Sequence, residues 1–146
     1  REEVPDEPEL LEIGKAQVTR EGSDLTIIGW GAMMRMVYDA VEEIEAKGGP
    51  SVEVIDLLSI SPLDTETIVA SVKKTGRCVV VQEAPRSFGV SSEIVARIND
   101  EALLYLEAPV KRVTGYDVVT PYFGREQEYF PSVDDICRGA RETLDF

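Results

Sequence analysis

The amino-acid sequence predicts an α/β fold, a three-layer α/β/α sandwich around a five-stranded mixed sheet. Short apolar runs alternate with segments in which apolar residues recur at helical spacing, which is typical of parallel strands joined by right-handed crossovers. The first two short strands have no helix between them. We therefore expect the first strand at an edge of the sheet, antiparallel to its neighbour, and the other strands parallel.

The first third of the chain predicts a strand pair and a helix. Residues 13–31 contain two short strands joined by a turn at 21–24, and residues 25–28 form a continuous apolar run, as in a strand buried on both faces. A helix follows and ends at the Lys-Gly-Gly-Pro of residues 47–50. Its buried face, methionines included, should consist of Met33, Met36, Val37, Ala40, Val41 and Ile44.

The middle of the chain repeats this pattern. Residues 51–60 read as a strand, and residues 77–82 as the next one. Between them we expect Ser61 to cap a helix that has Pro62 at its first position. Such a cap contributes about 1 kcal/mol to stability.

The last third completes the alternation. Residues 90–108 predict a helix, residues 109–118 a final strand and residues 120–131 an irregular segment. Ser132 should cap a last helix. The buried side of the helix at 90–108 should carry Ile94, Ile98, Ala102 and Tyr105.

Length and chain start bound the domain organisation. The 146 residues suffice for one domain, which we expect to span residues 11–146 after an acidic lead-in at 1–10. Because the sequence starts at Arg1 without a methionine, we expect it to be a piece of a longer protein. No apolar run approaches the ~20 residues needed to cross a bilayer, so we expect a soluble chain without a membrane partner.

The charge balance limits the possible partners. Fifteen basic residues against 28 acidic ones give a formal net charge of −13, which would repel DNA or RNA. Our leading interpretation is adaptation to concentrated salt. The alternative is an acidic face built for a basic partner, and the two can coexist. Cys78 and Cys137 are expected as buried hydrophobes, which indicates a reducing compartment and hence the cytoplasm.

Residue patterns for catalysis are weak. The chain has no histidine, which lowers the prior for acid–base catalysis. The loop Gly29-Trp30-Gly31 follows a buried strand, but Met34 stands where the dinucleotide fingerprint needs glycine. Glu83 and Arg86 are open to two interpretations: a catalytic carboxylate with an anion clamp, or an ion pair at the rim of a subunit contact.

Several strings of the sequence are similar to one protein family. The strings are IGWGAMM, EVIDLLSISPLDTETIVASVKKTGRCVVVQEAPRSFGVSSEI and LLYLEAPVKRVTGYDVVTPY. They resemble the C-terminal domain of the β subunit of the thiamine-diphosphate-dependent, decarboxylating component of 2-oxoacid dehydrogenase complexes, such as pyruvate and branched-chain dehydrogenases. The resemblance covers the chain from about Glu3 to its end. It implies a fold of the transketolase C-terminal type.

The resemblance also implies where the chemistry lies. In that family thiamine diphosphate and Mg²⁺ are bound by other domains of the whole enzyme, so this chain is expected to hold no cofactor, metal or catalytic residue and to be inactive alone. The expected partners are the α subunit and a second β subunit in an α2β2 heterotetramer. A further partner is the subunit-binding domain of the dihydrolipoyl acyltransferase.

Two sets of residues are expected to serve assembly. For the subunit interface, Pro85 and Gly89 shape a loop that presents a charge and an apolar anchor. That set is Glu83, Arg86 and Phe88. For acyltransferase docking, the resemblance points to the extreme C-terminus, namely Glu142, Asp145 and Phe146.

Two departures and one alternative remain. Gln82 stands where many relatives carry histidine or glutamate, so no role transfers to it. Residues 123–131 fit the family only loosely. The alternative function is a free-standing flavodoxin-like enzyme or cofactor-binding domain that uses the loops after Gly29 and Glu83. The sequence does not indicate which 2-oxoacid is the substrate.

Overall fold

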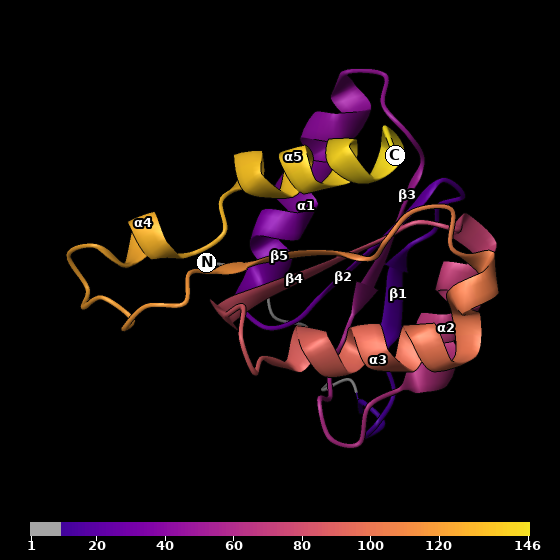
Figure 1. Cartoon of the computed structure of the whole chain (residues 1–146), viewed down its shortest axis with the longest axis horizontal. Coiled ribbons are helices and arrows are strands. Elements are labelled where there is room, and N and C mark those ends of the chain that lie inside the picture. The colour runs from indigo at the N-terminus through magenta and orange to yellow at the C-terminus, as the bar shows by residue number, and fades with distance from the viewer. Residues whose placement is uncertain (1–9) are drawn as a thin grey trace.

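Helices pack on both faces of a five-stranded sheet, as the alternation of apolar runs and amphipathic segments predicts (Figure 1). The computed structural model describes residues 10–146, so nearly all of the lead-in expected at 1–10 lies outside the described residues. The strands are β1 (Gln17–Arg20), β2 (Leu25–Gly29), β3 (Val52–Asp56), β4 (Cys78–Pro85) and β5 (Lys111–Gly115). The helices are α1 (Met33–Ala46), α2 (Thr65–Thr75), α3 (Val90–Ala102), the 3₁₀ turn η1 (Leu103–Tyr105), α4 (Glu126–Tyr129) and α5 (Val133–Leu144).

The sheet order is β1-β3-β2-β4-β5. β1 lies at one edge and pairs antiparallel with β3, with Gln17 opposite Asp56, and the remaining pairs are parallel. The predicted mixed sheet with an antiparallel first strand is therefore confirmed. β5 forms the other edge.

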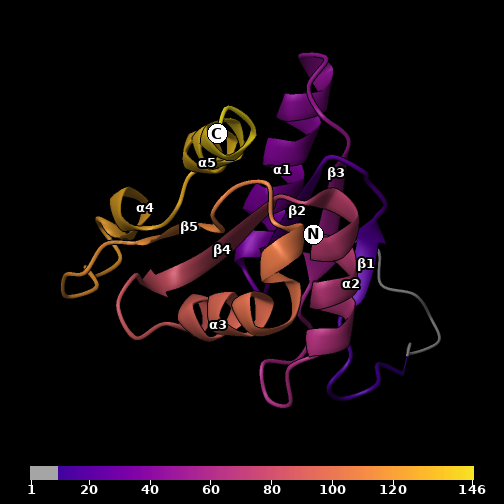
Figure 2. The same cartoon turned by 45° about the vertical axis from the view of Figure 1, so that its right-hand side comes forward.

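The continuous apolar run of β2 fills two cores. Leu25 and Ile27 pack on the side of α1 and α5, whereas Ile28 packs on the side of α2 and α3. Figures 1 and 2 show these helix pairs covering opposite faces of the sheet. Side chains alternate between the faces of a strand, so a strand covered on both faces is mostly apolar. The polar exception in β2 is Thr26, whose buried hydroxyl is hydrogen-bonded to the hydroxyls of Ser71 and Thr75 at 2.7 Å. Met33 is buried in the first core and Met36 packs against it, as predicted.

The start of α2 differs from the prediction. The helix begins at Thr65, and Asp64 is its cap: the carboxylate accepts hydrogen bonds from the Thr67 backbone N–H at 3.1 Å and hydroxyl at 2.8 Å. Asp64 also accepts from the Ala16 N–H at 3.0 Å, which ties the entry to β1. The prediction that Ser61 caps this helix with Pro62 at its first position is wrong, because both residues belong to the preceding loop.

The end of α3 also differs. Ile94, Ile98 and Ala102 are buried as predicted, but the α-helix ends at Ala102. The tighter 3₁₀ turn that follows breaks the helical periodicity. Tyr105 is therefore exposed beside Lys73, 5.2 Å from the ring centroid to Nζ, and its predicted burial is wrong.

The start of α5 is as predicted. Ser132 forms a capping box with Asp135: the Ser132 hydroxyl accepts from the Asp135 N–H at 3.2 Å, and the Asp135 carboxylate accepts from the Ser132 N–H at 3.0 Å. Among residues 10–146, no helix is long and apolar enough to cross a membrane.

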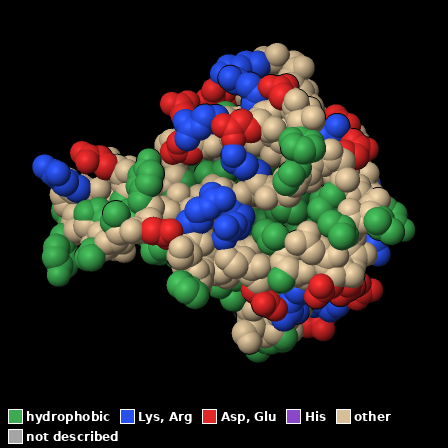
Figure 3. All heavy atoms as spheres, in the orientation of Figure 1, with side chains coloured by type: hydrophobic (Ala, Val, Ile, Leu, Met, Phe, Trp, Pro, Cys, Tyr) green, Lys and Arg blue, Asp and Glu red, His purple; other side chains and the backbone are tan. Residues whose placement is uncertain are grey.

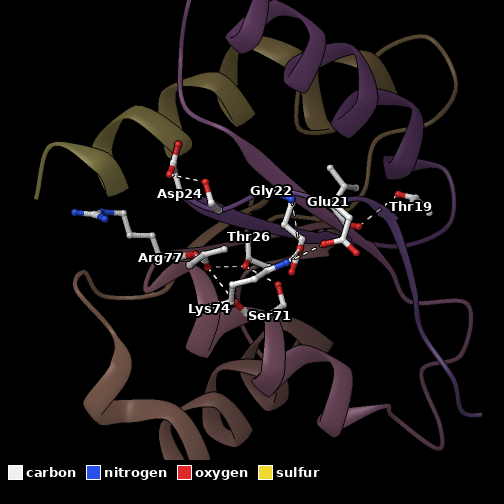
Figure 4. Close-up of polar contacts among 12 residues, drawn as sticks. Thr19, Glu21, Gly22, Asp24, Thr26, Ser71, Lys74 and Arg77 are labelled. Atoms are coloured by element: carbon white, nitrogen blue, oxygen red, sulfur yellow. Dashed lines mark hydrogen bonds and ion pairs between the residues drawn. The ribbon is translucent and has the colours of Figure 1, made fainter.

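A buried carboxylate links the sheet to α2. Glu53 of β3 is 1% exposed and forms an ion pair with Lys74. Lys74 also donates to Glu21 at 2.9 Å (Figure 4). Burial disfavours the charged carboxylate, but hydrogen bonds from Lys74, Ser71 and Gly22 outweigh burial and lower the pKa of Glu53. The ion pair and these hydrogen bonds therefore keep the Glu53 carboxylate ionised, although burial alone would favour its neutral form.

Candidate subunit interface

Gln82 braces the loop that follows β4. Its side chain is 1% exposed, and Nε2 donates to the carbonyls of Ala84 at 3.2 Å and Pro85 at 2.6 Å. Oε1 accepts from the Ser91 N–H in the first turn of α3 at 2.9 Å. A β-carbon at Gly89 would lie 2.2 Å from Nε2, so only glycine leaves room for this amide. The side chain for which sequence comparison suggested no role thus holds both ends of the loop.

Phe88 stands at the tip of this loop in an unusual conformation. Its φ is +56°, a left-handed backbone that costs a non-glycine residue about 1–2 kcal/mol. Its side chain is fully exposed. The exposed ring makes no contact with residues 10–146 of the folded chain that would offset the strain of its backbone. This favours a role for Phe88 in contact with another molecule.

Hydrogen bonds fix the loop against β5 and the residues after it. Asp117 accepts from the Ser87 backbone N–H at 2.8 Å and from its hydroxyl at 2.7 Å, and these bonds lower the pKa of Asp117. The Arg112 guanidinium donates to the Arg86 carbonyl at 3.0 Å and to the Ser92 hydroxyl at 2.7 Å. The loop is therefore a rigid platform.

Glu83 and Arg86 do not pair with each other in the described part of the chain. Both side chains are exposed, and no ion pair joins them. Arg86 instead reaches the Arg112 carbonyl at 3.5 Å. In the single chain both charges therefore face outward, and the ion pair at the rim of a subunit contact stays a prediction.

A second apolar surface lies on residues 116–131, here called the arm. The arm extends away from the sheet, and α4 lies in the part of the arm that returns toward it (Figures 1 and 2). Tyr122 is 96% and Phe123 is 89% exposed, whereas Tyr129 at the root is 4% exposed and packs edge-to-face with Phe130. The exposed large hydrophobics of the arm are Tyr116, Val118, Val119, Tyr122 and Phe123.

From the sequence, residues 120–131 are identified as irregular but no interface role is predicted for residues 116–131, although a signal is present. Aromatic and β-branched residues follow one another at 116–123 without the period of a helix or strand. Such residues in an irregular segment cannot all be covered by their own chain. Exposed apolar patches of this kind mark interaction surfaces.

The three predicted docking residues face different hollows. Glu142 forms an ion pair with Lys111, whose hydrogen bond lowers the pKa of Glu142, and lines a groove beside β5. Asp145 lies beside the end of α1, and Phe146, which is 81% exposed, lies beside Pro109. The structure does not gather them into a single pocket.

The loop after β2 shows no feature that requires a ligand. A β-carbon at Gly29 would lie 2.9 Å from the Met34 sulfur and 3.2 Å from a Val37 methyl, so this glycine lets α1 pack closely on the sheet. Burial raises the pKa of the Asp56 carboxyl and of the Cys78 thiol. A buried thiol with a raised pKa is a poor nucleophile.

Comparison with known proteins decides the family. The family model of the transketolase C-terminal domain matches residues 14–136. The chain belongs to the transketolase C-terminal domain family. This membership does not favour the alternative of a free-standing flavodoxin-like domain.

The chain is similar over its whole length to curated members of this family. It is 51% identical to the pyruvate dehydrogenase E1 component subunit beta of Staphylococcus aureus and 50% identical to that of Bacillus subtilis, over all 146 residues. The match lies in the C-terminal part of these relatives and spans 45% of their length. The resemblance noted in the sequence is thereby confirmed.

Solved structures agree on the transketolase C-terminal fold. A split-gene transketolase, described as an inactive beta4 tetramer, matches 92% of this chain and 43% of its own with a TM-score of 0.80 and 27% identity. The 2-oxoglutarate:ferredoxin oxidoreductase of Magnetococcus marinus matches 89% of this chain and 19% of its own with a TM-score of 0.59. At 14% identity, the second likeness shows the fold alone.

Proposed function

We propose that this chain is the C-terminal assembly and docking domain of the β subunit of a thiamine-diphosphate-dependent 2-oxoacid dehydrogenase, with pyruvate as the favoured substrate. The observation that carries the proposal is the exposure of Phe88 and the arm's aromatic side chains on a domain of this family. A 50% identity to pyruvate dehydrogenase β subunits supports the substrate. In this proposal residues 11–146 form one domain.

We infer that the described residues 10–146 do not themselves bind the cofactor. Residues 10–146 bring together no group of three or more histidine, cysteine, aspartate or glutamate side chains that could hold Mg²⁺. At the glycine-bearing loop after β2, the side chains of Met34 and Val37 from α1 fill the space next to Gly29. Thiamine diphosphate and Mg²⁺ would be bound by other domains of the enzyme. We assign no catalytic step to this chain.

The assembly we propose is an α2β2 heterotetramer. The arm and the loop with Glu83, Arg86 and Phe88 would contact the α subunit and the second β subunit. The rigid loop supports this role, because a preorganised surface loses little conformational entropy on binding. Aromatic side chains and arginine are the residue types enriched at the energetic centre of interfaces.

The docking surface we propose for the acyltransferase's subunit-binding domain includes Glu142, Asp145 and Phe146. An arginine of that domain would compete with Lys111 for Glu142. The Asp145 carboxylate has no ion pair among residues 10–146, so it is the more accessible of the two acids.

We also propose a cytoplasmic location and adaptation to concentrated salt. Cys78 and Cys137 are free thiols, as expected in a reducing compartment. The net charge of −13 supports salt adaptation, because dissolved ions screen the repulsion between like charges.

The experiment is an assembly measurement on the whole enzyme. The complete β subunit, carrying Tyr122→Ser and Phe123→Ser, is coexpressed with the α subunit, and the mass of the complex is measured by light scattering. We expect dissociation into smaller species. The control is Leu104→Ser, which removes a similarly exposed hydrophobic residue from η1. A tetramer of unchanged mass and stability in the arm variant would refute the proposed interface.

A further inference from the structure

A groove runs along β5, the strand at the open edge of the sheet. Its volume is about 420 Å³, within the ~300–1,000 Å³ of ligand pockets. Residues 111–116 line one side, and residues 129–131 with part of α5 line the other. An edge strand keeps one row of backbone N–H and C=O groups without a strand partner.

The groove is locally basic in a strongly acidic chain. Figure 3 shows Lys and Arg side chains gathered over β5 and below α5. Four cationic side chains line the groove against three acidic ones, which gives a local charge of +1 where the chain carries −13. The cations are Arg86, Lys111, Arg112 and Arg138, and the acids are Asp117, Asp135 and Glu142.

The three acids are already engaged. Glu142 pairs with Lys111, and Asp135 pairs with Arg138 while it caps α5. Asp117 accepts both hydrogen bonds from Ser87. None of these carboxylates forms an ion pair with the two remaining arginines.

Arg86 and Arg112 are the cations left over. Their guanidinium groups donate hydrogen bonds to each other's backbone carbonyls and to the Ser92 hydroxyl. Neither has a carboxylate within 4.0 Å among residues 10–146, although Arg86 is close enough to help lower the pKa of Asp117. A guanidinium carries five N–H donors and pairs with carboxylates through two parallel hydrogen bonds. Both side chains can therefore bind an external carboxylate without giving up an internal ion pair.

The root of the arm adds a polar group without a partner. Tyr129 lines the groove and is 4% exposed, and its buried hydroxyl has no hydrogen-bond partner in the described chain. A buried hydroxyl without a partner costs about 1–3 kcal/mol. An acceptor brought into the groove would remove that cost.

We propose that the groove along β5 binds an extended acidic segment of another polypeptide, which lies beside β5 as an added strand. Its backbone would pair with the free edge of β5. Its carboxylates would alternate toward Arg86 and Arg112, with smaller apolar side chains over Val113. This site shares Arg86 and the root of the arm with the proposed subunit interface, but it recognises charge and backbone groups, whereas the exposed side chains of the arm are apolar. Nucleic acid is a poorer occupant, because it has no peptide N–H and C=O groups to pair with the free edge of β5.

The test uses the full 146-residue chain, labelled with ¹⁵N, and a blocked hexapeptide of alternating glutamate and valine. We expect saturable shifts of the backbone amides of residues 111–115 in NMR spectra, with weaker affinity at higher salt. A hexapeptide of alternating lysine and valine should not bind. Tyr129→Phe should weaken binding about twofold to fivefold without loss of folding.

The decisive variant is Arg86→Gln with Arg112→Gln, which should weaken peptide binding at least tenfold. The matched control, Arg35→Gln with Lys47→Gln, removes two charges from the α1 side and should change affinity less than twofold. Each variant is accepted only if its NMR spectrum and thermal unfolding show a folded chain. Tyr122→Ser with Phe123→Ser should bind the peptide normally, which separates this site from the proposed interface.

Any of four results with peptides, variants or phosphate would overturn the proposal, and so would a fifth, with an oligonucleotide. The four are absence of binding, equal binding of the basic peptide, unchanged affinity in the folded arginine variant, and equal shifts at residues 111–115 from inorganic phosphate alone. The last result would indicate a site for small anions. An oligonucleotide that displaced the peptide at matched concentration would point to nucleic acid and would equally refute it.

Discussion

A β-carbon added to Gly89 would lie 2.2 Å from Nε2 of Gln82, so the loop after β4 and the start of α3 are held together by an amide that fits only above glycine. The φ of Gly89 is −83°, which any residue adopts. The requirement for glycine is therefore one of space and not of backbone conformation.

Gly89→Ala should lower the free energy of unfolding by about 1–3 kcal/mol, the usual cost of overpacking. The methyl group would displace the Gln82 amide from its three hydrogen bonds. Urea unfolding of the chain measures the effect. Gly124→Ala is the control, because a β-carbon there meets nothing within 4 Å and should change stability by less than about 0.5 kcal/mol. Equal stability of the two variants would contradict this account of the brace.

Removing the Asp64 carboxylate, which caps α2, should lower the stability of the chain. Removing the hydroxyl of Ser61, the cap predicted from the sequence, should not. Asp64→Ala loses the bonds from Thr67 and Ala16, so we expect a loss of about 1–2 kcal/mol. Ser61→Ala should stay within about 0.5 kcal/mol of the unmodified chain. Chemical denaturation of both variants decides, and a larger effect at position 61 would restore the original prediction.

Phe88→Gly should be more stable than Phe88→Ala by about 0.5–1 kcal/mol. Glycine adopts a φ of +56° without strain, and this gain exceeds the entropy that glycine adds to the unfolded chain. Thermal unfolding of the 146-residue chain measures the difference. Both variants should nevertheless weaken assembly of the complete enzyme. If alanine were the more stable, the loop would not hold this conformation in solution.

The contact between Ser87 and Asp117 should depend on pH with a definite sign. Its hydrogen bonds lower the pKa of Asp117 below the usual ~3.9, so the contact is fully present above that value and is lost as the pH falls through the lowered pKa. The Ser87 amide shift, followed by NMR from pH 6 downward, should show its midpoint below ~3.9. A midpoint at or above that value, or a Ser87 shift that changes no more with pH than in an Asp117→Asn control, would rule out the contact.

Stability should rise with salt if the acidity is an adaptation. Screening of the repulsion among 28 acidic residues should raise the midpoint of thermal unfolding by several degrees between low and molar KCl. A flat or falling response would argue against salt adaptation and leave the acidic face as a surface for a basic partner.

The sheet could be predicted from the sequence because its central strands are covered by helices on both faces and are therefore short, largely apolar runs. Three of the four residues from Leu25 to Ile28 are apolar, and the antiparallel first strand follows from the absence of a crossover before it. Ser132 was recognisable as a cap because a carboxylate stands three residues later. These features depend on neighbours in sequence.

The errors arose where tertiary contacts decide. Asp64 prevailed over Ser61 because its carboxylate also binds the Ala16 N–H, 48 residues away in sequence. The role of Gln82 depends on a loop that closes over it. The basic groove combines residues from β5, α5 and the loop after β4, which no linear pattern displays. The predicted interface and docking residues stay predictions until assembly is measured.

The brace that holds the interface loop is electrically neutral. The Gln82 amide is buried and does not titrate, whereas the charged residues of the same loop, Glu83 and Arg86, are exposed to dissolved ions. At 1 M salt the screening length falls to about 3 Å, so those charges lose most of their reach while the amide bonds are little affected. Ionic conditions would therefore set how strongly this surface attracts a partner, and the partner would meet the same loop shape in dilute buffer and in brine.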